Sequence, residues 1–283
     1  MSPQALAPAL GNTDERPRTS MFGQWWVLTV RVITPALRNG ELITLIGGAV
    51  GFTAAFYIPF SKPWSHYVVG ANSGIASSLG QYITPLIAMQ AVALAAISAA
   101  FRAATDTLDG VNRRFGSMPI APLTPVLART SASVYRCCIA LAVSLICGHV
   151  IGFRFYHGAG YIAGFCLLVI LVGALLSFGA DLIGTASGNP DAMLPLLSLP
   201  VLIFGLLSVG VQPIKLFPRW IQPVVRNQPI SQIVEVLRAL AGDTNPRIGS
   251  VTWSTVAPTV AWGLGFVVFL VPLAILVLSK RQR

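Results

Sequence analysis

The sequence predicts an all-α, polytopic membrane protein, and three observations lead to this fold class. Hydrophobic residues make up 54% of the 283-residue chain and charged residues only 10%, whereas about 25% of the residues in soluble domains are charged. Several uncharged runs reach the roughly 20 residues that a helix needs to cross a bilayer. These runs are continuously apolar rather than alternating, which favours helices over a closed barrel.

Six runs are predicted to be transmembrane helices. They are 42–60, 82–101, 131–153, 161–180, 192–211 and 255–278. Arg136 lies near the start of the third run, where its long side chain can snorkel to the interface. Pro195 and Pro200 interrupt the fifth run and mark candidate flexible points in it.

The chain before these runs is predicted to contain a tail and an interfacial helix. Residues 1–19 have no apolar core of a signal peptide, and we expect a disordered cytoplasmic tail. Residues 20–39 cannot span the membrane because Arg31 and Arg38 interrupt them. Their apolar residues recur at steps of three and four, so we expect an N-terminal helix in the interface, with Trp25 and Trp26 at head-group level. Residues 20–283 then form one transmembrane domain.

The segment 212–252 is predicted to be an external or re-entrant helical element before the last span. Its basic residues prevent spanning, because a central Arg or Lys costs about 2.5 to 3.5 kcal/mol on insertion scales. Its second half predicts a short amphipathic helix that ends at Gly242 and has Glu235 and Arg238 on its polar face. The apolar face consists of Ile230, Ile233, Val234, Leu237 and Leu240.

The distribution of basic residues favours cytoplasmic termini. Six spans place both termini on one side, and a cytoplasmic placement puts twelve Lys and Arg residues inside: four before the first span, five from Arg102 to Arg136 and three at the C-terminus. The remaining seven lie outside, five of them in 212–252, so the positive-inside rule favours this orientation. The external basic segment suits anionic head groups or an anionic substrate. Its candidate functional residues are Arg219, Trp220, Arg226 and Asn227.

A polar stretch, residues 104–129, separates the second and third runs and is interpreted as a cytoplasmic loop that receives force from a partner protein. Asp106 and Asp109 in this stretch form a D-x-x-D pair, and paired carboxylates can bind Mg²⁺. The alternative function is therefore a membrane-embedded, Mg-dependent prenyl- or phosphatidyl-transferase. The second carboxylate motif of such enzymes is missing from the other loops, which favours a charged loop. A scaffold protein without transport is the third hypothesis.

The sequence contains no motif for nucleotide binding, for a nucleophilic serine or for a zinc protease. No Gly-Lys dipeptide occurs, so there is no Walker A loop, and no G-x-S-x-G or H-E-x-x-H motif is present. The net charge of +10 is explained by arginines near span ends that meet anionic lipid, and nucleic-acid binding is not expected. The four cysteines are interpreted as small buried hydrophobes. No catalytic or metal-binding residue is therefore predicted.

Specific sequence strings resemble the daunorubicin-resistance (Drr) family of type-two ABC exporter permeases, most closely its mycobacterial DrrB-like members. The resemblance covers nearly the whole chain from about Trp25 onward, and the long loop string is highly specific. The strings are LRNGELIT (37–44), FYIPF (56–60), GQYITPL (80–86), FRAATDTLDGVNRRFGSMPIAPLTP (101–125), NPDAMLPLLSLP (189–200) and VRNQPISQ (225–232).

The resemblance implies a permease that binds no cofactor itself and works with other subunits in the plasma membrane. ATP and Mg would be used by a separate cytoplasmic ATPase dimer, DrrA-like, and a DrrC-like permease or a second copy would complete the membrane part. The implied activity is export of a hydrophobic or amphipathic substrate, either a complex lipid such as phthiocerol dimycocerosate or an anthracycline-like drug.

The resemblance also implies a coupling helix after the second span, which docks on the ATPase. Carried onto this chain, it covers residues 106–118. The site residues are Asp106, Leu108, Asp109, Arg113, Arg114, Phe115 and Met118.

Overall fold

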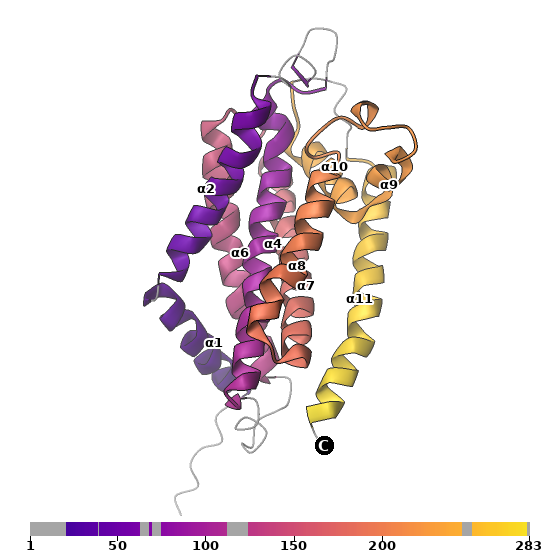
Figure 1. Ribbon diagram of the computed structural model, residues 1–283. Coiled ribbons are helices and arrows are strands. Elements are labelled where there is room, and N and C mark those ends of the chain that lie inside the picture. The colour runs from indigo at the N-terminus through magenta and orange to yellow at the C-terminus, as the bar shows by residue number, and fades with distance from the viewer. Residues whose placement is uncertain are drawn as a thin grey trace, which may run out of the picture.

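The computed structural model describes residues 21–38, 40–62, 68–69, 75–111, 124–244 and 251–281, and these residues form a helical bundle without strands (Figure 1). The apolar composition accounts for this, because helices satisfy their own backbone hydrogen bonds in lipid. The long helices are α1 (Met21–Arg38), α2 (Glu41–Phe60), α4 (Leu79–Leu108), α6 (Thr124–Val150), α7 (Ala159–Ser187), α8 (Pro190–Leu206) and α11 (Trp253–Arg281). Three short elements, η1 (Ile214–Leu216), α9 (Gln222–Asn227) and α10 (Pro229–Ala241), form what we call the cap.

The predicted class of polytopic, all-helical membrane protein is confirmed. Within the described ranges, five helices are long and apolar enough to cross a membrane: α2, α4, α6, α7 and α11. The predicted span 192–211 corresponds to the shorter apolar helix α8, which ends at Leu206. Gln228 explains this end, because its side-chain amide donates hydrogen bonds to the carbonyls of Phe204 (3.1 Å) and Leu207 (2.8 Å) that the helix leaves unpaired.

Several helices extend beyond the predicted runs into the charged flanks. The second run, 82–101, lies inside α4, which continues to Leu108. The fourth run, 161–180, lies inside α7, which continues through Asp181 to Ser187. Only Gly188 and Asn189 separate α7 from α8, so the polar stretch that follows the fourth run is mostly helical. Asp181 is a buried helical residue that has an ion-pair partner, so its charge did not end the helix.

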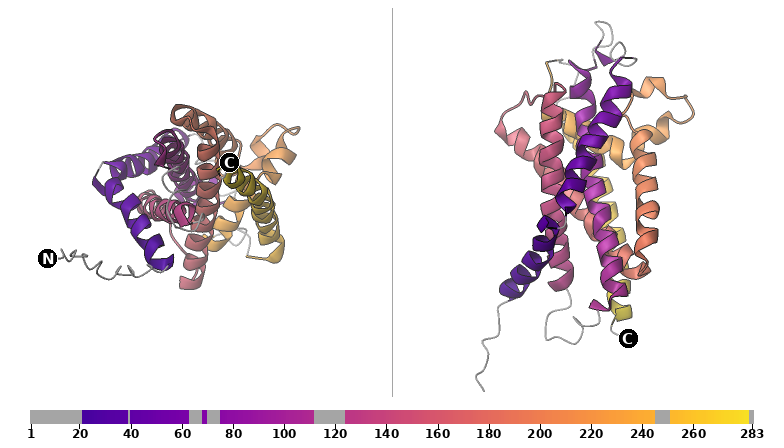
Figure 2. Two further views of the ribbon diagram at one scale, coloured as in Figure 1. Left: turned by 90° about the horizontal axis from the view of Figure 1, so that it is seen from below. Right: turned by 60° about the vertical axis from the view of Figure 1, so that its left-hand side comes forward.

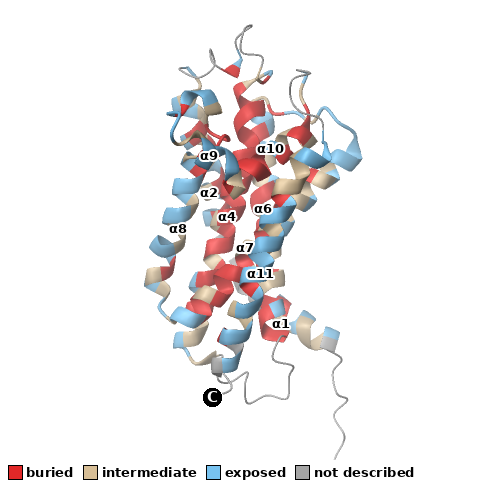
Figure 3. Ribbon diagram, turned by 90° about the vertical axis from the view of Figure 1, so that its right-hand side faces the viewer, coloured by how far each residue is buried: buried red, intermediate tan, exposed pale blue. Residues whose placement is uncertain are grey.

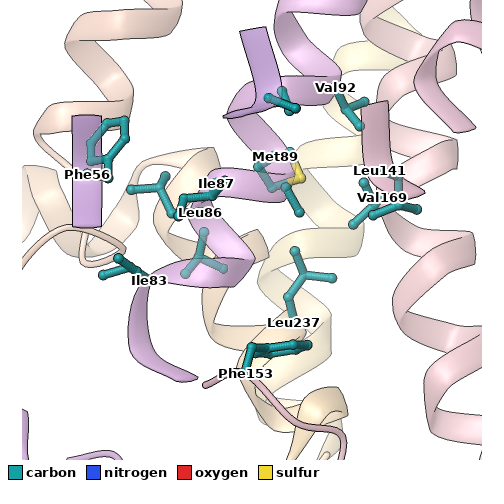
Figure 4. Packing of buried hydrophobic residues seen from close by; sticks show 14 of the residues in the cluster. Phe56, Ile83, Leu86, Ile87, Met89, Val92, Leu141, Phe153, Val169 and Leu237 are labelled. Carbon is teal, nitrogen blue, oxygen red and sulfur yellow. The ribbon is translucent and has the colours of Figure 1, made fainter. Parts of the chain in front are cut away.

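Helix α4 lies at the centre of the bundle and contacts α2, α6, α7, α8 and α10. In the most apolar stretch of α4, 89% of the residues are buried, whereas only 11% are buried in the corresponding stretch of α11. Figure 3 shows this contrast as a buried α4 behind exposed stretches of α8 and α11. Larger apolar residues fill the space around α4, including Phe56, Leu141 and Leu237 from three other helices (Figure 4).

Small residues allow the neighbouring helices to approach α4 closely. Gly184 of α7 lies against the backbone carbonyl of Ala100, and Gly173 of the same helix lies against Val92 and Cys137. Gly205 of α8 leaves room for the side chain of Gln90. Close backbone approach at small residues is how membrane helices gain van der Waals contact, since lipid provides no hydrophobic drive between them.

The amphipathic helix α1 leans across one end of α6, at an angle to α2 (Figures 1 and 2). Trp25 donates a hydrogen bond from Nε1 to the hydroxyl of Ser131 (3.1 Å). Trp26 and Arg31 are exposed. We call the end where α1 meets α6, and where α4 ends and α6 begins, the loop end. The opposite end carries the cap.

The cap is fixed to α4 by Arg238. Its guanidinium donates hydrogen bonds to the carbonyls of Tyr82, Val209 and Gly210 at 2.8 to 3.2 Å and lies over the Tyr82 ring, 3.7 Å from its centroid. Arg238, expected on the polar face of this helix, therefore reaches into the bundle, whereas the apolar face and the stop at Gly242 are confirmed. The side chain turns inward because three backbone carbonyls converge there.

Replacement of Gly184 by Ala is expected to lower thermal stability in detergent. The added Cβ would overlap the Ala100 carbonyl, and overpacking of this kind typically costs about 1 to 3 kcal/mol. Gly263→Ala in α11 is the matched control, because nothing lies within 4 Å of the added atom and Ala favours helix. An unchanged melting temperature for Gly184→Ala would contradict the close α4–α7 contact.

Candidate functional site

The predicted site residues lie at two opposite ends of the bundle. Asp106, Leu108 and Asp109 lie at the loop end, whereas the four residues of the basic segment belong to the cap region (Figure 1). The predicted loop residues Arg113, Arg114, Phe115 and Met118 lie outside the described residues. The two described ends that they connect in the sequence, the end of α4 and the start of α6, lie at the loop end.

The last turn of α4 presents both polar and apolar groups at the loop end. Asp109 is the C-cap, and its backbone N–H donates to the carbonyl of Thr105 (2.9 Å). Gly110 follows with φ +67°, a left-handed conformation that glycine adopts readily. Leu108 is exposed. The chain therefore leaves α4 by a defined turn, and the apolar side chain of Leu108 is exposed at that point.

A buried ion pair joins the start of α6 to α7 beside this turn. Arg129 binds Asp181 through two parallel hydrogen bonds, Nε to Oδ1 at 2.6 Å and Nη2 to Oδ2 at 3.0 Å. The side chains are 8% and 2% exposed. A bidentate arginine–carboxylate pair fixes orientation as well as charge, so α6 and α7 are held in one register at the loop end.

Asp106 adds a third charge to this cluster from α4. Its Oδ2 lies 3.9 Å from Nη1 of Arg129, and its side chain is 34% exposed. Three helices therefore meet around one guanidinium, which we call the Arg129 cluster (Asp106, Arg129 and Asp181). Sequence reasoning missed the pairing. The available signal was that a charge next to an apolar run in a helix bundle normally has a buried partner.

This geometry does not favour the transferase alternative. Asp106 faces a guanidinium, which already supplies the positive charge that a metal ion would supply, and Asp109 closes the helix end. Among the described residues, no three His, Cys, Asp or Glu side chains are grouped closely enough to hold a metal ion.

The other predicted residues are placed as follows. Trp25 binds Ser131, Trp26 and Arg31 are exposed, and Arg38 ends α1. Arg219 and Trp220 lie exposed in the turn before α9. Arg226 and Asn227 end α9, and the Asn227 carbonyl accepts a hydrogen bond from Trp262 of α11 (3.0 Å). The α1 residues therefore lie at the loop end, whereas Arg219, Trp220, Arg226 and Asn227 lie in the cap region, at the end opposite the Arg129 cluster.

Replacement of Arg129 by Met should destabilise the protein more than replacement of Asp106 by Asn. Loss of Arg129 leaves Asp181 charged and buried, and breaking such a pair costs about 3 to 5 kcal/mol. Asp106 is partly solvated and more distant, so its loss should matter less. The double variant Arg129→Met/Asp181→Leu should regain most of the lost melting temperature. Additive losses in that double variant would contradict the pair.

Comparison of the sequence with known proteins identifies the family of this chain. No protein-family model matches the chain. The chain is 60% identical over 267 residues to the doxorubicin resistance ABC transporter permease protein DrrB of Mycobacterium tuberculosis, which covers 94% of this chain and 92% of that protein.

Two further relatives are more distant. The probable doxorubicin resistance ABC transporter permease protein DrrC of Mycobacterium tuberculosis is 29% identical over 258 residues, 88% of this chain and 89% of the relative. The daunorubicin resistance ABC transporter permease protein DrrB1 of Streptomyces coeruleorubidus is 26% identical over 177 residues, 62% of each chain. The resemblance predicted from the sequence strings is confirmed. The chain belongs to the DrrB family of ABC transporter permeases and is a membrane subunit distinct from the ATPase.

Proposed function

We propose that this permease exports a hydrophobic or amphipathic molecule out of the cell, driven by a DrrA-like ATPase dimer that docks at the loop end. The observation that carries the proposal is the Arg129 cluster, because it links α4, α6 and α7 next to the segment that joins α4 to α6. A push on that segment therefore reaches three helices at once. The permease itself would hold no cofactor, since ATP and Mg belong to the partner.

The proposed topology has six spans, with both termini in the cytoplasm. Helix α8 has 17 residues, or about 26 Å at 1.5 Å per residue, close to the roughly 30 Å of a hydrocarbon core. Helix α1 would lie in the cytoplasmic interface and the cap outside. The excess of basic residues at the loop end supports this orientation in the plasma membrane.

A second permease would complete the transport path. Either a DrrC-like subunit or a second copy of this chain would take that place, and the similarity to DrrC over 88% of this chain shows that two such permeases share their length and pattern. The apolar side chains that α8 and α11 leave exposed suit contact with lipid, with a partner helix or with an apolar substrate.

Transport would follow from a change in the relative free energies of two arrangements of the bundle. ATP binding would close the ATPase dimer and move the loop, and α4, α6 and α7 would tilt together. Helix α8 contains Pro195 and Pro200, which remove backbone hydrogen bonds and let it bend. Substrate export then depends on different affinities in the two states.

The substrate class is supported by the names of the relatives. Proteins named for doxorubicin and daunorubicin resistance suggest an anthracycline-like drug. A complex lipid such as phthiocerol dimycocerosate fits the same apolar surfaces. Both are bulky and poorly soluble, which suits a path lined by Leu, Val and Phe rather than by charges.

The test is ATPase activity of the partner subunit, reconstituted with this permease and its sibling permease. The charge reversal Arg113→Glu/Arg114→Glu should abolish the stimulation given by the wild type, because it reverses the charge of the proposed docking segment. Arg219→Glu reverses an exposed charge beside the cap and should leave stimulation unchanged. Failure of the wild-type chain to bind or stimulate any ATPase would contradict the exporter mechanism.

A further inference from the structure

A polar pocket lies between the cap and the first turns of α11, at the end of the bundle away from the Arg129 cluster. Its volume is about 670 Å³, which is within the range of small-molecule sites. Figure 1 shows α9 and α10 next to the start of α11. The lining consists of Ile214, Gln222, Pro223, Arg226, Asn227, Gln232, Glu235, Ser254, Thr255 and Pro258.

The pocket contains one cation and one anion that do not bind each other. Among the described residues, the side chains of Arg226 and Glu235 make no ion pair or hydrogen bond with any group, and both are exposed. They nevertheless interact at longer range. Partial burial raises the pKa of Glu235, and the charges of Arg238 and then Arg226 lower it. Arg238 is already bound to backbone carbonyls, so Arg226 is the cation that remains available in the pocket.

The frame around these two charges is fixed by hydrogen bonds. Gln232 of α10 donates from Nε2 to the carbonyl of Arg226 (2.6 Å). Trp262 of α11 donates to the carbonyl of Asn227 (3.0 Å), and Gln222 donates to the carbonyl of Phe217 (2.9 Å). The end of α9 is thereby tied to both α10 and α11, so the pocket is preformed and a ligand would not have to order it.

Exposed tryptophans near the pocket favour a position at the depth of lipid head groups. Trp220 is 79% exposed and Trp253 is 75% exposed, and exposed tryptophans gather at the membrane–water interface. From Trp253 the helix α11 runs away from the cap, and the face that carries Pro258 continues with the exposed apolar residues Phe269 and Leu276. A polar site therefore continues directly into a surface that suits acyl chains.

We propose that this pocket binds the head group of a zwitterionic phospholipid, with the phosphate on Arg226, the ammonium on Glu235 and the acyl chains along α11. A guanidinium binds phosphate by charge-assisted hydrogen bonds, and the carboxylate complements the ammonium. An anionic lipid would satisfy Arg226 but bring its charge near Glu235. A cationic amphiphile would satisfy Glu235 but bring its positive charge near Arg226. This inference does not depend on ATP-driven export.

The test is native mass spectrometry of the full-length permease titrated with phosphatidylethanolamine, with phosphatidylglycerol and with a cationic two-chain amphiphile. The wild type should retain phosphatidylethanolamine in preference to the other two. Arg226→Gln and Glu235→Gln should each weaken this binding about tenfold, or ~1.4 kcal/mol. Neither side chain has a partner to lose within the described structure, so both variants should keep the wild-type melting temperature.

The matched control is Lys215→Gln, which removes an exposed charge of the same segment that does not line the pocket. It should bind phosphatidylethanolamine like the wild type. Equal binding by the wild type, Arg226→Gln and Glu235→Gln would overturn the proposal. Preference of the wild type for phosphatidylglycerol or for the cationic amphiphile would also overturn it. Because no ATPase takes part, failure here is distinguishable from failure of the proposed transport function.

Discussion

The close backbone contact between α4 and α7 is the constraint on which the rest of the bundle depends. In lipid, apolar side chains gain little by leaving their surroundings, so helices associate through van der Waals contact and hydrogen bonds. Gly184 has no side chain, so α7 can approach the backbone of Ala100 closely. With α7 in place, α6 and α8 pack on the remaining faces of α4, and the bundle has one buried helix rather than a ring of equivalent ones.

Several polar side chains inside this bundle connect one helix to another. Arg129 joins α6 to α7 at the loop end, and Arg238 joins the cap to α4 at the other end. Both arginines are distant in sequence from their partners. The middle of α4 contains Gln90, which donates to the carbonyl of Val201 in α8 (3.2 Å). Such bonds fix the positions of helices that apolar packing alone would leave free to slide.

The sequence predicted the class, most helix positions and the amphipathic helix α10, because apolar periodicity depends only on neighbouring residues. It did not predict that Asp181 lies within α7 or that Arg238 turns inward. Hydropathy treats each charge as if it entered lipid alone, whereas Asp181 enters with Arg129, 52 positions away in the chain. Likewise, nothing local shows that Gln228 binds the last carbonyls of α8. The resemblance to the family predicted that the loop end is a functional site. The buried ion pair at that end could be found only from the three-dimensional structure, because its two residues are far apart in the sequence.

The position of Arg238 has a consequence for the route by which a molecule leaves the bundle. Separation of α10 from α4 would take the guanidinium away from the carbonyls of Tyr82, Val209 and Gly210. The Val209 carbonyl would keep its hydrogen bond from the Tyr82 hydroxyl (2.6 Å), but any buried polar group left unpaired costs about 1 to 3 kcal/mol. The cap is therefore held firmly on α4, and we do not expect it to swing open as a hinged element. Departure sideways, past the exposed apolar flanks of α8 and α11, would leave the contact between α10 and α4 intact.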